Sequence, residues 1–206
     1  VGLPLINIGN KLAEDGEILA KGDNIMMGYY KDQKSTDEVL KDGWLSTGDI
    51  GQWIDGKYLK IIDRKKEMFK TSGGKYVVPQ VIESKMVESP FIEQFMVVGE
   101  GQKYPAAFVV PAYNNLLDWV KKSANNLISL PKEDFLTNEI IKEKIKTEID
   151  KVNANFGNWE QIKKFSIITE EFTIETGELT PTLKMKRKII IEKYKQNYNE
   201  LFNINS

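Results

Sequence analysis

Short apolar runs separated by turn signals fill the first sixty residues of the chain. Three Asp-Gly pairs, at residues 15–16, 42–43 and 55–56, punctuate runs such as LPLINI, EILAKG and YLKIID. Asp-Gly between apolar runs is a strong signal for a tight β-turn. One segment, QKSTDEVLKDG, interrupts the pattern and offers Ser35 or Thr36 as the N-cap of a short helix. The pattern predicts a small β-rich unit.

From Asp63 onward, strand-like runs alternate with helical periodicity. Pro79 suits the first turn of a helix that continues through VIESKMVES. FIEQFMVVG and AAFVVP are predicted to be strands, and the second is apolar at nearly every position, which is typical of a central strand. The spacing of apolar residues predicts further elements, namely helices over 113–123, 138–152 and 186–202 and a strand over 165–168.

These elements indicate an α+β fold in two parts. Residues 1–62 are predicted to form the β-rich subdomain, and residues 63–206 an α+β domain whose short sheet is flanked by helices. The chain starts at Val1 without a methionine, and VGLPLINI has the pattern of the middle of a fold. We therefore expect the chain to be a fragment of a longer protein.

Charge and composition narrow the classes of function. The 29 basic and 30 acidic residues give a net charge of -1, which argues against a dedicated nucleic-acid-binding protein, because such domains are clearly basic. No run approaches the ~18 apolar residues of a membrane-spanning helix, and no charged and apolar leader opens the chain. The expectation is a cytoplasmic protein, with membrane contact only at the periphery.

The chain contains no cysteine and no histidine. Disulfides, thiolate nucleophiles, Ser-His-Asp triads and histidine-bound zinc are excluded from it. Its chemistry must use carboxylates, lysines, arginines, hydroxyls and backbone amides. Such groups are better suited to binding and stabilising phosphates than to nucleophilic bond cleavage.

The segment GWLSTGDIG carries the first candidate residue, Asp49. A carboxylate that follows glycine just before a strand can accept hydrogen bonds from two neighbouring hydroxyls, as a ribose diol offers. The alternative is an aspartate that only caps a turn.

The segment DRKKEMFKTSGGKYVVPQVIE combines charges, glycines and a proline. Arg64 ends a predicted strand, where its guanidinium can bind a diol or phosphate in two places. Gly73 and Gly74 permit a positive φ and a close approach of the backbone to a ligand, while Pro79 fixes the next helix. A mobile joint beside a rigid helix start suggests a hinge. The alternative is a solvated run of charges.

The segment GELTPTLKMKRK places Lys184 where a loop meets the last predicted helix. This lysine could instead be one more surface lysine. Lys186, Arg187 and Lys188 could form a basic patch that contacts an anionic partner or a membrane surface.

Taken together and in this order, the three segments resemble the C-terminal part of the AMP-forming acyl-CoA synthetases, members of the adenylating superfamily. The resemblance also includes GEILAKGDNIMMGYYK and WEQIKKF and covers almost the whole chain. The form DRKKEMFKTSGGKYVVP is most similar to the long-chain fatty acyl branch. The chain departs from many members before Lys184, where Thr182-Leu183 replaces Ser-Gly. The family's phosphate-binding loop has no counterpart in this sequence.

The resemblance implies a role for each matched residue. Asp49 would hold the ribose hydroxyls of ATP, Arg64 would contact the same nucleotide, and Lys66 would be the hinge. Lys184 would be the adenylation lysine. Ser72, Gly73 and Gly74 would line the tunnel for the pantetheine of CoA, with Lys70 nearby.

The implied reaction is the ATP-dependent activation of a fatty acid to acyl-AMP and then to acyl-CoA, with Mg²⁺ accompanying ATP. The implied partners are fatty acid, ATP, CoA and the remainder of the large N-terminal domain, and we expect the chain to be inactive alone. Two alternatives stay open. One is an aryl-CoA or carrier-protein adenylating enzyme, and the other is a non-catalytic module that binds a membrane or partner through its basic patch.

Overall fold

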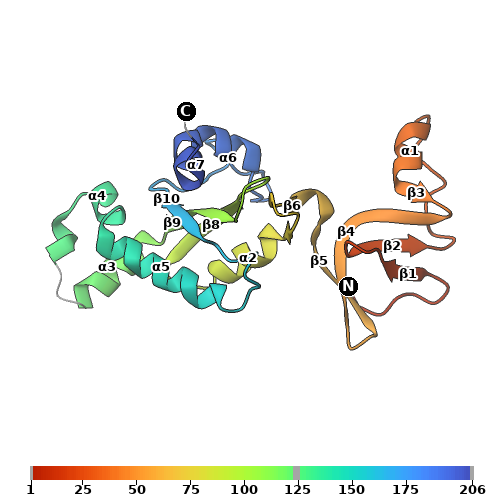
Figure 1. Cartoon of the computed structure of the whole chain (residues 1–206), viewed down its shortest axis with the longest axis horizontal. Coiled ribbons are helices and arrows are strands. Elements are labelled where there is room, and N and C mark those ends of the chain that lie inside the picture. Colours follow the sequence, from red (N-terminus) through yellow and green to blue (C-terminus); the bar gives the residue numbers. More distant parts are fainter. Residues whose placement is uncertain (1, 123–125, 205–206) are drawn as a thin grey trace. The chain divides into compact units, whose positions relative to one another are not determined.

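The computed structural model describes residues 2–122 and 126–204, without the side chains of Asp63, Lys66 and Asn126. The chain divides into two compact units, Val1–Met68 and Phe69–Ser206, which we call unit 1 and unit 2. The division falls at Met68, whereas the sequence pattern changes at Asp63. Both units mix sheets with helices (Figure 1), which confirms the predicted α+β class.

Unit 1 is built around an antiparallel sheet. Its elements are β1 (Gly9–Leu12), β2 (Glu17–Lys21), α1 (Gln33–Val39), β3 (Leu40–Lys41), β4 (Trp44–Ile54), β5 (Tyr58–Arg64) and the 3-10 turn η1 (Lys65–Glu67). The strands lie in the order β1-β2-β4-β3, and β5 also pairs with β4. The three Asp-Gly pairs lie between consecutive strands, as predicted. Asp55 and Gly56 both have positive φ, 51° and 65°, which matches the mirror-image turn that suits the twist of a hairpin.

Helix α1 is capped one turn earlier than the sequence predicted. The Asp32 carboxylate accepts hydrogen bonds from the Ser35 backbone N–H at 3.0 Å and from the Ser35 hydroxyl at 2.7 Å. Thr36 lies inside the helix, and its hydroxyl accepts a hydrogen bond from the Tyr29 N–H. The prediction of Ser35 or Thr36 as the cap was therefore wrong, because the cap precedes the N–H groups that it satisfies.

Unit 2 contains a two-stranded hairpin, a three-stranded sheet and most of the helices. Its strands are β6 (Phe69–Lys70), β7 (Tyr76–Val77), β8 (Ile92–Val98), β9 (Ala106–Pro111) and β10 (Lys164–Ile167). Its helices are α2 (Pro79–Met86), α3 (Tyr113–Lys122), α4 (Lys132–Leu136), α5 (Glu139–Asn153), α6 (Arg187–Lys193) and α7 (Lys195–Phe202), with the 3-10 turn η2 (Asn126–Ser129). The sheet order β10-β9-β8 makes β9 central, as its apolar sequence predicted. Strand β9 is antiparallel to β8 and parallel to β10, to which it is connected through α3–α5.

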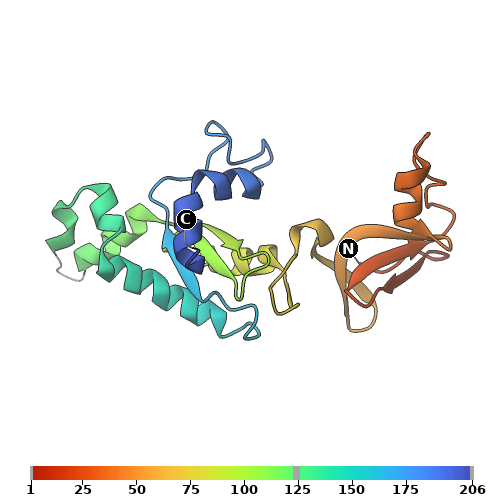
Figure 2. The ribbon, with the colours of Figure 1, turned by 45° about the horizontal axis from the view of Figure 1, so that its top comes forward.

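The sheet of unit 2 separates two apolar clusters. Alternate residues of β8 and β9 belong to opposite clusters: Val97 and Val109 pack with α2, α3, α4 and α5, whereas Met96 and Phe108 pack with α6 and α7. Figures 1 and 2 show α5 and α7 on opposite sides of this sheet. Burial on both faces explains why β9 is apolar throughout and why β8 is apolar from Phe95 onward.

The C-terminal segment forms two helices where the periodicity predicted one over 186–202. Helix α6 ends and α7 begins at Tyr194, whose φ of -106° and ψ of 36° are not helical. The Tyr194 ring lies 6.0 Å from the rings of both Phe108 and Phe172. The prediction of one helix was wrong because Tyr194 packs into the core, and no glycine or proline marks the break.

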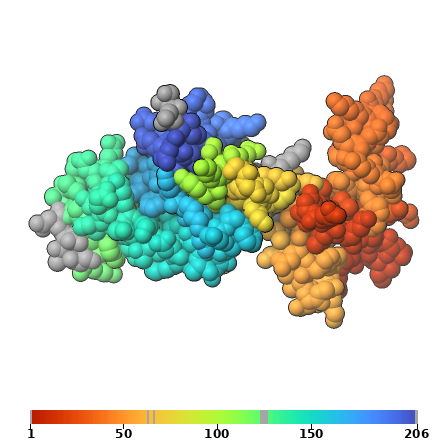
Figure 3. Space-filling model, in the orientation of Figure 1, coloured from red at the N-terminus to blue at the C-terminus, as the bar shows by residue number. Residues whose placement is uncertain are grey.

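Helices form much of the surface of unit 2 on the face that Figure 3 shows. In Figure 3 the residues of α4 and α5, green to cyan, form a continuous surface, with the blue residues of the C-terminal helices beside it.

Among the helices described, none has the length and apolar character needed to cross a membrane.

Candidate functional site

Asp49 and Arg64 face each other across strands β4 and β5 in unit 1. They are direct partners in the register, and Arg64 Nε lies 3.1 Å from Asp49 Oδ1. Direct partners in an antiparallel pair project to the same face of the sheet. The Asp49 side chain is largely covered, at 22% exposure, while Arg64 is 69% exposed. The structure thus joins the two residues that were predicted to contact one nucleotide.

A one-residue irregularity in the register creates this pair. Gly51 faces Ile61, and a regular ladder would continue by placing Asp63 opposite Asp49. The register shifts between Ile50 and Gly51, so that Arg64 takes that place. β-bulges of this kind redirect side chains and are common beside functional sites. The shift replaces an acid by a cation opposite Asp49.

Lys65 holds the segment that follows β5 to the rest of unit 1. Its ammonium lies 2.7 Å from Asp15 Oδ2 and 2.8 Å from Glu17 Oε2. Glu17 is buried, and its other oxygen accepts a hydrogen bond from the Gly48 N–H, next to Asp49. The hydrogen bonds to Asp15 and Glu17 raise the pKa of Lys65 above its usual range, and the bond from Lys65 lowers the pKa of Asp15.

Lys66, the predicted hinge residue, follows this clamp within η1. Its side chain lies outside the described part of the structure. The assignment of Lys66 as a hinge stays a prediction.

Lys70, Ser72, Gly73 and Gly74 lie on one hairpin in unit 2. Strands β6 and β7 pair Lys70 with Tyr76, and the Lys70 ammonium lies 4.6 Å from the centroid of the Tyr76 ring. Gly74 closes the turn with a φ of 75°, a conformation that glycine adopts without strain. Apart from Gly74 itself and its two chain neighbours, no atom of the described residues lies within 4 Å of the position that a Gly74 Cβ would occupy. The tip of the hairpin therefore leaves room for a ligand.

The base of this hairpin is fixed to unit 2. Phe69 and Val77, which are register partners, belong to the core cluster. The Ser72 N–H donates to the Gln102 carbonyl at 2.8 Å, and the Gly101 N–H donates to the Lys70 carbonyl at 2.8 Å. Only the turn itself is open, so the predicted tunnel residues have a rigid support.

Lys184 lies near the tip of a loop that precedes α6, residues 173–186, which we call the Lys184 loop. Its backbone is paired across the tip with Thr180: the Thr180 N–H donates to the Lys184 carbonyl at 2.8 Å, and the Lys184 N–H donates to the Thr180 hydroxyl at 3.0 Å. Leu183, between them, has a φ of 59°. The Lys184 side chain is exposed. An ordered backbone thus presents a solvated ammonium group.

The predicted residues fall into three groups. Asp49 pairs with Arg64 in unit 1, whereas Lys70 and residues 72–74 share the β6–β7 hairpin and Lys184 lies on its own loop, both in unit 2. Sequence reasoning missed the supporting side chains Lys65 and Glu178. Their partners are distant in sequence, as with Glu178 and Lys193, so no local motif marks them.

Arg187, which the sequence placed in a basic patch, points into unit 2. Its guanidinium lies 2.7 Å from Glu83 Oε2 and donates to the Val97 carbonyl at 3.0 Å. The Glu83 carboxylate also accepts a hydrogen bond from the Val97 N–H at 2.7 Å. Arg187 therefore joins α6 to α2 and β8.

Among the side chains that the structure describes, no group of three or more acidic residues is arranged to hold a metal ion. A hollow of about 380 Å³ lies between α5, β10 and α7. None of the predicted site residues lines it.

Both the sequence and the fold of this chain match those of known proteins. Residues 67–205 match the family model described as the AMP-binding enzyme C-terminal domain. The chain is 33% identical over 203 residues to long-chain-fatty-acid–CoA ligase FadD15 of Mycobacterium tuberculosis, covering 98% of this chain and 34% of the relative. It is 38% identical over 194 residues to long-chain-fatty-acid–CoA ligase 6 of Homo sapiens, covering 92% of this chain and 27% of that protein.

A solved structure shows the same fold. The A domain of carboxylic acid reductase from Segniliparus rugosus, in complex with AMP and a co-purified carboxylic acid, superposes with a TM-score of 0.73 at 24% identity. The match covers 98% of this chain and 32% of that one. The chain thus spans about a third or less of the length of the proteins that it matches.

Proposed function

The chain belongs to the AMP-binding enzymes, whose C-terminal domain it carries, and on that premise we propose that it is the C-terminal part of an ATP-dependent, AMP-forming long-chain fatty acid–CoA ligase. The observation that carries the proposal is the similarity to long-chain-fatty-acid–CoA ligases, which extends over 92% to 98% of the chain. In this proposal residues 1–62 are the end of the large adenylation domain, and residues 63–206 are the small, mobile domain.

The ligands proposed for the chain fit the chemistry of its residues. The Asp49 carboxylate, held by Arg64, is suited to the ribose hydroxyls of ATP. The open turn at Gly73 and Gly74 leaves room for the pantetheine of CoA, with Ser72 beside it and Lys70 at its base. Mg²⁺ would accompany ATP and neutralise charge on its phosphates.

The proposed reaction has two steps. The fatty acid carboxylate attacks the α-phosphorus of ATP, forming acyl-AMP and releasing pyrophosphate. The CoA thiol, losing its proton, then attacks the acyl carbon, and AMP leaves as acyl-CoA forms. Lys184 stabilises the negative charge on the carboxylate and phosphate oxygens during the first step. Rotation at Lys66 would then exchange the Lys184 loop for the β6–β7 hairpin at the active site.

The test is to assay each half-reaction separately in the full-length enzyme. Lys184→Ala should slow acyl-AMP formation about a hundredfold to a thousandfold, because it removes one preorganised cation. With ready-made acyl-AMP and CoA it should form thioester at nearly the native rate. Gly74→Leu should show the reverse pattern, because its side chain would occupy the path of the thiol.

Matched variants separate these effects from loss of folding. Lys121→Ala removes an exposed lysine from α3, and Gly56→Leu places leucine at another open, positive-φ turn, in unit 1. Both should be close to native in both steps. Equal losses in the two steps for Lys184→Ala and for Gly74→Leu would contradict the proposed division of roles. Residues 1–206 alone should release no pyrophosphate from ATP and palmitate above a Lys184→Ala control.

Two alternatives are tested alongside. An aryl-CoA or carrier-protein adenylating enzyme would exchange pyrophosphate with benzoate or an amino acid in preference to palmitate. A non-catalytic module that binds an anionic membrane would co-sediment with phosphatidylserine vesicles in a salt-sensitive manner. Only Lys186 and Lys188 of the basic patch are left for such a contact, since Arg187 is held by Glu83.

A further inference from the structure

Glu178 is a fully buried carboxylate in the Lys184 loop, at 0% exposure. It lies six residues before Lys184 and is not one of the residues matched to a role above. A buried charge is costly unless it is paired and hydrogen-bonded. The contacts of Glu178 therefore indicate what its charge is used for.

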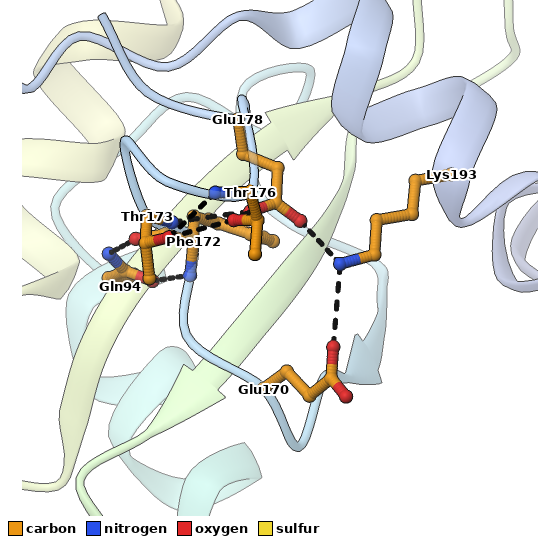
Figure 4. A network of polar contacts seen from close by, with 7 residues as sticks. All are labelled: Gln94, Glu170, Phe172, Thr173, Thr176, Glu178 and Lys193. Atoms are coloured by element: carbon orange, nitrogen blue, oxygen red, sulfur yellow. Dashed lines mark hydrogen bonds and ion pairs between the residues drawn. The ribbon is translucent and has the colours of Figure 1, made fainter.

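The Glu178 side chain binds three groups from two segments (Figure 4). Oε1 lies 2.7 Å from the Lys193 ammonium of α6. Oε2 accepts hydrogen bonds from the Thr173 N–H, at 3.2 Å, and from the Thr176 hydroxyl. Burial opposes ionisation of Glu178, but these donors outweigh it and lower the pKa of the carboxyl below its usual value. The group is thus an anion that links the start of the loop to α6.

The backbone of Glu178 joins the other side of the loop. Its carbonyl accepts a hydrogen bond from the Lys186 N–H at 2.7 Å, and the adjacent Leu179 forms a β-bridge with Met185. The Leu179 N–H also donates to the Thr173 carbonyl at 2.9 Å. Glu178 therefore lies where the two sides of the loop meet, directly below the Thr180–Lys184 pairing.

The same region is attached to the sheet. The Gln94 side chain of β8 donates to the Phe172 carbonyl at 3.0 Å and accepts from the Phe172 N–H at 2.7 Å (Figure 4). Phe172 is buried in the cluster formed with α6 and α7. Phe172, just before the Lys184 loop, is thus held by β8. Glu178 in turn holds the start of the loop to α6.

We propose that Glu178 is a positioning residue for the adenylation step, in which its buried carboxylate fixes the base of the Lys184 loop and so orients Lys184 toward the reacting phosphate. This inference rests on the role proposed above for Lys184. Replacing a buried ion pair by apolar groups is often neutral or stabilising, so stability alone does not account for the pair. We attribute the pair to its role in holding the Lys184 loop in a single conformation.

The experiment compares Glu178→Gln with the native full-length enzyme. The substitution keeps the shape of the side chain and removes its charge. We expect the kcat of acyl-AMP formation to fall about tenfold to a hundredfold, because a displacement of about 1 Å at a reacting group has an effect of that size. KM for ATP and the rate of thioester formation from acyl-AMP should be unchanged. Hydrogen exchange at the Thr180, Lys184 and Lys186 amides should become faster, while exchange in β8 and β9 stays native.

Variants of Lys193 supply the controls. Lys193→Met should reproduce the effect of Glu178→Gln, and Lys193→Arg should restore most of the native rate because it restores the cation. Lys195→Met makes the same substitution in a solvent-exposed pair with Glu192 and should have no effect. If Glu178→Gln does not fold, Thr176→Val, which removes one donor at an exposed position, should give a smaller loss confined to the same step.

The outcomes distinguish this inference from the proposed function. A native rate of acyl-AMP formation in Glu178→Gln, combined with a slow Lys184→Ala enzyme, would overturn the inference alone. Equal losses of both half-reactions in Glu178→Gln would also overturn it. A native Lys184→Ala enzyme would overturn the proposed function and the inference together.

Discussion

At the scale of single residues, the role proposed for Asp49 in holding the ribose of ATP can be tested directly. Asp49→Ala in the full-length enzyme should weaken ATP binding by about 1.5 to 3 kcal/mol, because a charge-assisted contact to the ribose hydroxyls is lost. The effect should appear in both half-reactions, since ATP and acyl-AMP contain the same ribose. The measurement is the ATP and acyl-AMP concentration dependence of each step.

The control for Asp49 is Asp23→Ala, which removes an exposed carboxylate from the same unit. It should leave both dependences native. If Asp49→Ala also leaves both dependences native, Asp49 serves only the pair with Arg64 in the sheet.

Leu183 has a backbone conformation that is unusual for a residue other than glycine. Its φ of 59° lies in the left-handed region, and its side chain is 69% exposed, so little packing offsets the strain. Leu183→Gly relieves the strain in the folded state but increases the conformational entropy of the unfolded chain. Because these two effects oppose each other, we expect the free energy of unfolding to change by less than about 1 kcal/mol. The reaction rates should be close to native.

Leu183→Val should behave differently, because branching at Cβ disfavours positive φ. We expect a loss of more than about 1 kcal/mol in unfolding free energy and slower acyl-AMP formation. Leu183→Met, which is unbranched at Cβ, is the matched control. Equal behaviour of the valine and methionine variants in urea unfolding would show that the backbone conformation at Leu183 does not matter.

At the scale of elements, Glu148 ties α5 to the turn after α2. Its carboxylate accepts hydrogen bonds from Ser89, Lys144 and Lys151 at 2.8 to 3.0 Å. Burial opposes ionisation, but these three donors outweigh it and lower the pKa of Glu148 from its ordinary 4.5 to about 2. Because the folded pKa lies below the unfolded one, the stabilisation is complete above about pH 4.5 and is lost as the pH falls toward 2.

The expected loss is about 3 kcal/mol of unfolding free energy across that range. Urea unfolding at pH 5 and pH 2.5 measures it. Glu148→Gln should lack this part of the pH dependence, and Glu139→Gln, in an exposed pair on the same helix, should retain it. The same slope in all three proteins would refute the assignment.

The elements also show which features sequence patterns can predict. Pro79 begins α2 and the Asp-Gly turns connect the strands of unit 1, because local preferences decide these features. The break at Tyr194 depends on contacts with Phe108 and Phe172, which are distant in sequence. The pairing of Asp49 with Arg64 likewise depends on a register shift, which no local sequence pattern predicts. The resemblance was enough to propose the site residues. The side chains that hold them in place, such as Lys65 and Glu178, could be identified only from the structure.

At the scale of the whole molecule, the two units differ in their cores. Among the described residues, the buried hydrophobic side chains of unit 1 are Ile18, Ile50 and Leu59, whereas both core clusters consist of residues of unit 2. A unit of this size with so small a core has little stability of its own. We therefore expect residues 69–206 to fold alone and residues 1–68 to remain largely unfolded.

The measurement is the amide dispersion in NMR spectra of the two segments and their unfolding in urea. Residues 69–206 should show a dispersed spectrum and a cooperative transition. A cooperative transition in residues 1–68 alone would contradict the prediction. The result does not depend on activity, so it tests the account of the cores separately from the proposed function.

The small core of unit 1 has a consequence for biosynthesis. A ribosome releases residues 1–68 before the residues of unit 2, and neither core cluster of unit 2 contains a residue of unit 1. Unit 1 exposes large apolar side chains, including Leu5, Ile6 and Met27, at 72%, 91% and 99%. In a nascent chain in which these side chains are not yet covered, they are available to chaperones.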